Sequence, residues 1–398
     1  MNHNSPISPM IEHAPRSRDG LRAAVASIMK RVEAEALANE QAGTLTPAVV
    51  QALKDQKLWW MFVPAEVGGD GADIVTAIEL VEALARADGS TGWTFMANSL
   101  LTGGAAAYLS EEGVNALFRQ PEPAILAGQV GPIGTAVRAE GGLIGKGRYS
   151  FTSGSSHASH IGCGFFLLDA DGNQQMRPDG QPETWVGFVP RDQMIFQGNW
   201  DVMGMTGTGS FDLELPETFI PDHLTLDLIS STHQRRRPGF AIGLYGNGYA
   251  GHAAVALGLT ARALGEVARI ASAKARPGYP GATGDYPLFQ HQFALREAQY
   301  RGARAYVLEV FGDAEAAAIT GHIPPELHAR MIQSAVVLHN VASEIIQFCH
   351  LWSGTASLRN PSMLGRTVRD MMAATQHLLV DQKMLVDVAP TIIASWSS

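Results

Sequence analysis

The sequence predicts an α+β chain of several domains: an N-terminal α-helical domain, a central antiparallel β-barrel or sandwich, and a C-terminal four-helix bundle. Hydrophobic residues recur first at helical spacing, then at the two-residue spacing of strands, and then at helical spacing again. This order of all-α, all-β and all-α differs from the alternation of strands and helices in a doubly wound sheet. The expected divisions are a flexible tail at 1–20, the N-terminal helical domain at 21–122, the β-domain at 123–228 and the bundle at 229–398.

Helical periodicity defines the N-terminal domain from Leu21 onward. In IELVEALARAD, apolar residues three and four positions apart form one stripe that a helix can bury. Thr44 or Thr46 before Pro47 predicts a capped helix over 44–57. The glycine-containing segments 64–71 and 88–93 are expected to be turns.

Short apolar runs mark the β-domain. They include ILAGQV, LIGKGRYSF and GSFDLEL, and turn sequences such as Glu140-Gly141-Gly142 and Asp171-Gly172-Asn173 separate them. Short strands at this spacing, with turn signals between them, favour an antiparallel sheet or a small barrel.

The bundle begins at about Phe240, where helical spacing returns. Proline- and glycine-containing breaks separate the expected helices, and the short connections indicate an up-down arrangement. The four helices are predicted at 241–275, 287–320, 325–352 and 362–388.

Composition narrows the class of protein. With 46% hydrophobic and 8% aromatic residues, the 398-residue chain has ample side chain to bury and is not expected to be disordered. Only 17% of its residues are charged, which suggests that an oligomer covers part of its surface. The net charge of −9 argues against nucleic-acid binding. We find neither a signal peptide nor an apolar run long enough for a membrane span, and we therefore expect a cytoplasmic protein.

Several motifs fail once their context is considered. GNGYAG at 246–251 lacks the flanking strands of a dinucleotide site, so its glycines indicate close helix packing. His157 and His160 would point to opposite faces of a strand, and two cysteines, Cys163 and Cys349, are too few for a thiolate zinc site. We therefore expect no metal. Residues 235–237, three arginines, are expected to form a solvated loop.

Three segments resemble a known family when taken together: GRYSFTSGSSHASH at 147–160, WDVMGMTGTGSFDLELPETFIP at 200–221, and LGRTVRDMMAATQH at 364–377. Their order and spacing resemble the acyl-CoA dehydrogenase superfamily. That resemblance implies the predicted three-domain plan, a flavin between the β-domain and the bundle, and usually a homotetramer.

The carboxylate base of the true dehydrogenases is missing from both places where the resemblance would put it. In the dehydrogenases the base is the glutamate of a Tyr-Glu-Gly-Thr run before the last helix. We assign that run to Trp352-Ser353-Gly354-Thr355, where serine cannot remove a proton alpha to a thioester. A variant group carries the glutamate early in the first bundle helix, but no Asp or Glu stands between Asp227 and Glu266.

The segments look instead like the flavin-dependent monooxygenase branch, the oxygenase components of two-component systems. The resemblance implies that a separate NAD(P)H:flavin reductase supplies reduced flavin, as FMNH2 or FADH2. Through a C4a-hydroperoxide formed with O2, one oxygen atom then passes to a small aromatic or heteroaromatic substrate, for example a phenol or an indole. An acyl-CoA dehydrogenase-like oxidoreductase, a nitro- or amino-compound oxidase, and a flavin-free binding relative remain alternatives.

The resemblance assigns roles to individual residues. Ser153 would hold its hydroxyl against flavin N5, and Phe151 would flank the ring from the same strand face. Backbone that passes close to the flavin is expected where glycines alternate with hydroxyl residues. The expected cofactor-binding residues are Phe151, Ser153, Gly154, Met205, Thr206, Gly207, Thr208 and Trp93.

His377 is the second expected catalytic residue. Residues 366, 370, 373 and 377 are spaced to share one face of a helix, and the resemblance places the histidine beside flavin and substrate. Such a histidine can transfer a proton. Arg366, Arg369 and Asp370 are expected to form structural ion pairs.

One departure from the branch bears on the substrate. Many members carry a histidine about nine residues after the glycine of the GSTGW segment, and that place falls at or near Leu101 here. A phenol-activating base is therefore missing, which suits an indole or another electron-rich ring. We expect Asn98, Leu101 and His157 to line the substrate pocket.

Overall fold

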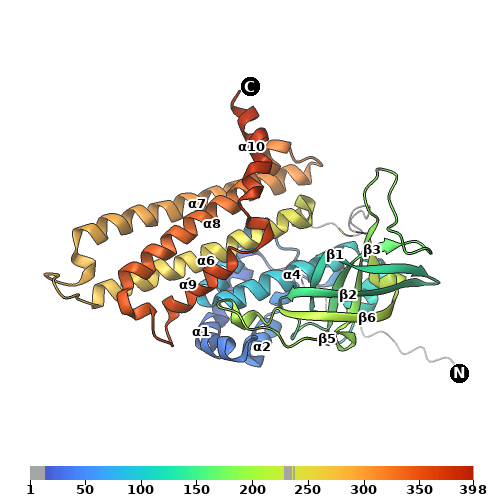
Figure 1. Ribbon diagram of the computed structural model, residues 1–398, viewed down its shortest axis with the longest axis horizontal. Helices are drawn as coiled ribbons and strands as arrows, with labels where there is room; N and C mark the ends of the chain where they lie inside the picture. The colour runs from blue at the N-terminus through green and yellow to red at the C-terminus, as the bar shows by residue number, and fades with distance from the viewer. Residues whose placement is uncertain (1–13, 228–234, 236–237, 398) are drawn as a thin grey trace.

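The computed structural model describes residues 14–227, 235 and 238–397, and it has the predicted order of helices, sheet and helices (Figure 1). Capping side chains set the starts of the N-terminal helices: Thr46 Oγ1, for example, accepts from Val49 N at 3.4 Å. The helices are α1 (Arg18–Ala42), α2 (Pro47–Asp55), α3 (Ile74–Ala87), α4 (Gly89–Tyr108) and α5 (Glu111–Leu117).

The segment 88–93, predicted as a turn, is instead the beginning of α4. Asp88 caps this helix by accepting from Thr91 N at 3.0 Å. A Cβ on Gly92 would lie 2.5 Å from Ala85, so the glycine lets α4 approach α3 closely. The glycines that suggested a turn are therefore required by helix packing.

The central domain is one seven-stranded sheet with the strand order β5-β6-β2-β1-β3-β4-β7. The prediction of a wholly antiparallel sheet is wrong at one pair, because β1 and β3 run parallel. After β2, which runs antiparallel to β1, the chain reverses in a short turn and forms β3 on the other side of β1. This reversal makes β3 run in the same direction as β1. The strands are β1 (Leu126–Ala139), β2 (Gly142–Thr152), β3 (His160–Leu168), β4 (Thr184–Pro190), β5 (Ile195–Phe196), β6 (Phe211–Pro221) and β7 (Thr225–Leu226).

The bundle helices α6 (Gly243–Ala273), α7 (Pro287–Ile319) and α8 (Pro325–Ser353) lie side by side (Figure 1). The predicted fourth helix, 362–388, is wrong, because it divides into α9 (Met363–Ala374) and α10 (Lys383–Trp396). Side chains between them bond to the local backbone: His377 accepts from Leu379 N, and Asp381 accepts from Lys383 N. These local bonds replace the helical ones.

Helix α4 is positioned between the sheet and the bundle (Figure 1). One hydrophobic cluster joins the N-terminal helices to the bundle, and a second joins α4 and α5 to the sheet. The glycines of GNGYAG lie in α6, where a Cβ on Gly251 would reach Met96 of α4 at 2.5 Å. Close helix packing explains this motif, as the sequence indicated.

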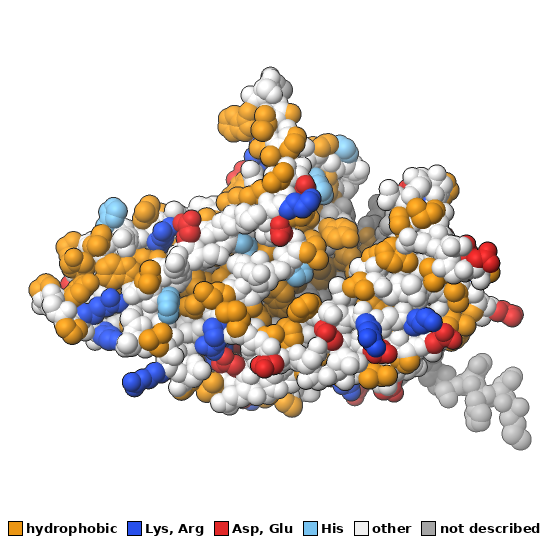
Figure 2. Space-filling model, viewed as in Figure 1, with side chains coloured by type: hydrophobic (Ala, Val, Ile, Leu, Met, Phe, Trp, Pro, Cys, Tyr) orange, Lys and Arg blue, Asp and Glu red, His pale blue; other side chains and the backbone are white. Residues whose placement is uncertain are grey.

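Apolar side chains stay exposed on and before the projecting helix α10 (Figure 2). Their exposed fractions are 65% for Leu378, 71% for Val386, 68% for Ile393 and 84% for Trp396. No described helix is long and apolar enough to cross a membrane.

Two smaller predictions are corrected. Arg235 is buried rather than solvated, because it donates to the carbonyls of Ala106 and Leu109 and pairs with Glu111; residues 236 and 237 lie outside the described residues. His157 lies in a turn and His160 begins β3, so they do not alternate along one strand.

Candidate functional site

Three of the expected site residues meet between α4, the β-domain and the segment before α10. Trp93 Nε1 of α4 donates to Ser153 Oγ at 3.1 Å. The Trp93 ring also meets the His377 ring edge-on, with 5.9 Å between centroids. The fold therefore brings together residues that stand 60 and more positions apart in the sequence.

Ser153 follows the end of β2 rather than extending the strand, so the expected strand face shared with Phe151 is wrong. Phe151 has a φ of +59°, and Ser153 N donates back to Phe151 O at 3.0 Å. This reversal leaves the Phe151 ring 72% exposed, 6.2 Å from the ring of Trp200. An aromatic surface and a hydroxyl thus lie in adjacent parts of one turn.

A chain of hydroxyls continues from Ser153 into the Met205–Ser210 segment. Ser153 Oγ lies 2.7 Å from Ser210 Oγ, which lies 2.7 Å from Thr208 Oγ1. Thr208 in turn donates to Met205 O at 2.8 Å. Met205 has a φ of +56°, and its N–H donates to Asp370 Oδ1 of α9 at 2.7 Å.

The glycines of these two segments pack against helices. A Cβ on Gly154 would lie 2.0 Å from Asn98 Oδ1, and one on Gly207 would lie 3.0 Å from both Asn39 and Ser90 side chains. Close contact with α1 and α4 therefore requires these glycines, whereas the sequence analysis attributed them to the approach of a flavin.

His377 lies beyond α9, so the predicted helical face shared with residues 366, 370 and 373 is wrong. Its Nδ1 accepts from Leu379 N at 3.2 Å, which leaves the proton of the neutral ring on Nε2. Burial lowers the pKa of His377 to about 4. The imidazole is thus neutral near pH 7 and can donate from Nε2.

His252 of α6 also belongs to this site, and sequence reasoning missed it. Its ring lies 3.9 Å from the His377 centroid and 4.9 Å from that of Trp93. Burial lowers the pKa of His252 well below its ordinary value, and His377 and then His339 lower it further. A lone histidine in the apolar stretch YAGHAAVALGL was the available signal.

His339 of α8 is the third histidine of the group. Its Nδ1 donates to Ala335 O at 2.8 Å, and burial lowers its pKa to about 4. Among the described residues, His339 Nε2 and His252 Nδ1 have no hydrogen-bond partner. No described group of three or more His, Cys, Asp or Glu residues is arranged to hold a metal ion.

The two arginines of α9 form the expected structural ion pairs, whereas Asp370 accepts a backbone N–H instead. Arg369 pairs with Glu40 of α1, and Arg366 lies 3.6 Å from the same carboxylate. Asp370 is buried beside Asp88, and its pKa is raised to about 7, mainly by burial. Its hydrogen bond from Met205 joins α9 to the β-domain.

The residues expected to line the substrate pocket make other contacts. Asn98 Nδ2 donates to Leu126 O at 2.8 Å, and Leu101 packs against the core of the sheet. His157 Nε2 lies 3.2 Å from Thr44 Oγ1, and burial lowers its pKa to about 4. Their assignment to the substrate pocket stays a prediction.

The assignment of the dehydrogenase base to Ser353 is wrong in position. Ser353 ends α8 and donates to Ser357 Oγ at 2.9 Å, whereas the stretch before the last helix is 375–382. The acid in that stretch, Asp381, is exposed and caps Lys383.

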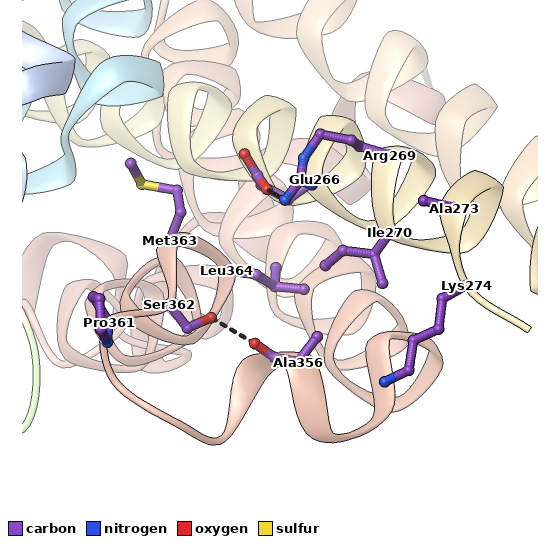
Figure 3. Close-up of a pocket in the computed structure, with 10 residues that line it drawn as sticks. All are labelled: Glu266, Arg269, Ile270, Ala273, Lys274, Ala356, Pro361, Ser362, Met363 and Leu364. Carbon is purple, nitrogen blue, oxygen red and sulfur yellow. Dashed lines mark hydrogen bonds and ion pairs between the residues drawn. The ribbon is translucent and has the colours of Figure 1, made fainter. Parts of the chain in front are cut away.

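A cavity of about 350 Å³ lies elsewhere, between the end of α6 and the loop before α9 (Figure 3). Arg269 and Glu266 pair there at 2.8 Å, and Ser362 donates to Ala356 O at 2.9 Å. No expected site residue lines this cavity.

Comparison with protein families identifies the fold. The model of the acyl-CoA dehydrogenase N-terminal domain matches residues 16–116, and that of the C-terminal domain matches residues 250–382. The chain belongs to the acyl-CoA dehydrogenase superfamily.

Its sequence relatives are on the flavin-dependent monooxygenase branch of that superfamily. Indole-3-acetate monooxygenase of Pseudomonas putida is 27% identical over 330 residues, which cover 83% of this chain and 82% of the relative. The oxygenase component of the FADH2-dependent resorcinol hydroxylase of Rhizobium sp. is 26% identical over 211 residues, 52% of this chain and 49% of the relative.

Solved structures have the same fold. XiaF from Streptomyces sp., in complex with FADH2 and glycerol, superposes with a TM-score of 0.85 at 21% identity, over 95% of this chain and 96% of that one. The HsaA monooxygenase from M. tuberculosis gives 0.84 at 21% identity, over 95% and 98%.

Proposed function

We propose that this chain is the oxygenase component of a two-component flavin-dependent monooxygenase. It would use reduced flavin and O2 to hydroxylate a small aromatic or heteroaromatic compound. The observation that carries the proposal is the meeting of Trp93, Ser153, His252 and His377 on a superfamily fold whose sequence relatives are monooxygenases.

The described residues fit a flavin. The turn at Phe151 offers an exposed aromatic ring next to Ser153, whose hydroxyl would face flavin N5. Backbone of the Met205–Thr208 segment borders the same turn, because Gly154 N donates to Thr208 O at 2.9 Å. Bound reduced flavin supplies the electrons that activate O2.

The protein side chains would handle protons and exclude water. The neutral His377 ring can donate a hydrogen bond from Nε2, and it could take up a proton as a general base once Nδ1 releases Leu379 N–H. His252 is buried and packs against His377 and Trp93, so it shields one side of each of these rings from water. Ser353 is not a carboxylate, Asp381 is exposed, and the sequence has no Asp or Glu between Asp227 and Glu266, which argues against an acyl-CoA dehydrogenase.

An electron-rich heteroaromatic ring is the substrate we favour. Leu101 stands where a phenol-activating histidine was expected, and it packs into the sheet core. The relative matched over most of this chain is named for indole-3-acetate. Both points support a substrate that needs no deprotonation.

We further propose a cytoplasmic homotetramer that receives its flavin from a transient NAD(P)H:flavin reductase. The exposed apolar residues of α10, among them Val386, Ile393 and Trp396, would be covered by other copies of the chain. Sedimentation of the wild type against Ile393→Lys would test this: a single tetrameric species should become smaller in the variant.

An isotope experiment tests the function. Purified protein, a generic flavin reductase, NADH and ¹⁸O2 are incubated with indole or a phenol, and one ¹⁸O atom is expected in the product. Ser153→Ala should still bind reduced flavin but release more H2O2 per NADH consumed, since the hydroxyl facing N5 is gone. Reduction of bound flavin by an acyl-CoA, with no labelled product from any aromatic compound, would refute the proposal.

A further inference from the structure

The protons of the hydroxyl chain next to Ser153 can be assigned from chemistry alone. A carbonyl accepts and never donates, so the order that makes every hydrogen bond gives the single hydroxyl proton of Thr208 to Met205 O. Ser210 must then donate to Thr208, at 2.7 Å. With the proton of Ser210 used, Ser153 must donate to Ser210, also at 2.7 Å.

Trp93 completes the assignment at Ser153. Indole Nε1–H is a donor only, so Ser153 Oγ accepts from it at 3.1 Å. Among the described residues, the hydroxyl has thus used its one proton and one of its two lone pairs. It can offer any further partner a lone pair but no proton.

This arrangement is fixed by its surroundings. Ser210 and Thr208 are buried, with 3% and 1% of their surfaces exposed, so water does not compete for their protons. Met205 is tied to Asp370 at 2.7 Å, and the Trp93 ring is held between α6 and the segment before α10. Reversing the chain would remove the hydrogen bond from the Thr208 hydroxyl to Met205 O, which would keep only the bond from Thr208 N at 3.1 Å, so the reversed order has one hydrogen bond fewer.

We propose that this directed chain of hydroxyls makes the site select reduced flavin over oxidised flavin, an inference that rests on the proposed function for the placement of Ser153 at N5. Reduced flavin carries a proton on N5 and can donate to Ser153. Oxidised flavin presents a lone pair at N5, which faces the lone pair of Ser153 without a proton between them. Ser210 and Thr208 are therefore positioning residues that act through Ser153.

The expected preference has the size of one hydrogen bond. A net contribution of about 0.5–1.5 kcal/mol corresponds to a roughly two- to tenfold ratio of dissociation constants. The ratio, rather than either constant, is the quantity that the proton assignment controls.

The test is the ratio of Kd for oxidised and reduced FMN, and likewise FAD, measured anaerobically by equilibrium dialysis. Ser210→Ala removes the acceptor of the Ser153 proton, which can then turn toward oxidised N5. Oxidised flavin should bind more tightly than it does to the wild type, and the ratio should fall by about two- to tenfold.

Two further variants separate this effect from loss of structure. Thr208→Val frees the proton of Ser210 for Ser153, and should therefore reproduce the change seen with Ser210→Ala. Trp93→Phe leaves the hydroxyl chain intact, so both affinities should change together and the ratio should persist. Ser153→Ala should lower the ratio without any gain in affinity for oxidised flavin.

The possible failures are distinguishable. If neither redox form binds the folded wild type, the proposed function is wrong. If both forms bind but Ser210→Ala and Thr208→Val keep the wild-type ratio, the proton assignment is wrong although the function stands. A fall in the ratio caused only by weaker binding of reduced flavin would also overturn the inference.

Discussion

The hydroxyl chain and the histidines of the candidate site differ in how their polar atoms are satisfied, although Thr152 Oγ1 and Ser155 Oγ beside that chain are also buried without a partner among the described residues. On the β-domain side, Ser153, Ser210 and Thr208 form a continuous chain in which every hydroxyl proton has an acceptor. On the bundle side, His252 Nδ1 and His339 Nε2 are buried without a hydrogen-bond partner among the described residues. A saturated chain fixes the direction of its protons, whereas an unpaired imidazole can still take or give one.

The difference assigns separate tasks to the two sides. Buried polar groups are normally paired, and exceptions are concentrated where a function needs them. Burial lowers the pKa values of His339 and His377 to about 4, so these rings are neutral near pH 7. We infer that the hydroxyl side recognises the cofactor and that the imidazole side moves protons.

The largest effect on activity is expected from a substitution at His377. If activity were unchanged, the imidazole side would not have the proton-moving task assigned to it. His377→Ala should lower product formation by about 10²–10⁴-fold, the usual contribution of one proton-transferring group. The measurement is turnover under saturating reduced flavin, together with the melting temperature. Stability should change little, because the side chain is only half-buried.

His377→Asn is the matched control, because an amide oxygen can still accept from Leu379 N where His377 Nδ1 does so at 3.2 Å. The asparagine variant should be as inactive as the alanine variant. Recovery of activity in His377→Asn would mean that the enzyme needs the hydrogen bond from Leu379 N, and not the imidazole ring.

Asp370 joins the two sides, since it accepts from Met205 of the β-domain and lies on α9 of the bundle. Its pKa is raised to about 7, mainly by burial. A raised acid pKa means that the folded state holds the proton more tightly, so stability from this group is present at low pH and is lost as pH rises from about 4 through 7.

Asp370→Asn keeps an oxygen for Met205 N–H but cannot ionise. As the pH rises from 5 to 8, the free energy of unfolding of the wild type should fall by about 2–3 kcal/mol relative to that of the variant. Urea unfolding at both pH values measures this difference. Equal pH dependence in both proteins would show that Asp370 is ionised in the folded state throughout that range.

The sequence predicted most helices well because their apolar stripes are local patterns. The helix predicted at 287–320 is observed at Pro287–Ile319. The break after Ala374 was missed because residues 366, 370, 373 and 377 fit helical spacing, although His377 and Asp381 bond to local backbone instead. The parallel pairing of β1 with β3 also depends on where the chain crosses the sheet, and no local pattern records it.

Residues of the candidate site could be predicted from the sequence only where they belong to a recognisable motif. Ser153 and Trp93 were expected at a flavin, and the structure brings them together with His377. His252 and His339 were not found, because they join the site through packing of α6 and α8 and not through neighbouring residues in the sequence. The direction of the hydroxyl chain likewise required the distances between side chains.

His252→Phe tests the imidazole side through the pH dependence of stability, and its expected effect is smaller. The ring can still pack on Trp93 and His377, but the buried titratable nitrogens are removed. Because the pKa of His252 is depressed in the folded state, its contribution to stability is present above pH 6.5 and is lost as the pH falls. As the pH falls below 6.5, the free energy of unfolding of the variant should therefore decrease less than that of the wild type. The same acid sensitivity in both proteins, measured by urea unfolding, would show that the pKa of His252 is not lowered in the folded state.

The smallest effect concerns the outer edge of the hydroxyl side. Thr44 Oγ1 lies 3.2 Å from His157 Nε2, and it would lie 3.0 Å from a Cβ on Gly209, so this residue stands between the two turns that carry the hydroxyl chain. Thr44→Val removes the hydrogen bond and should cost about 1 kcal/mol or less of stability. If His157 only anchors its turn, the ratio of flavin affinities and the KM for the aromatic substrate should stay unchanged. A raised KM at unchanged melting temperature would instead place His157 at the substrate, as the sequence predicted, and would extend the proton-moving imidazoles to the β-domain side.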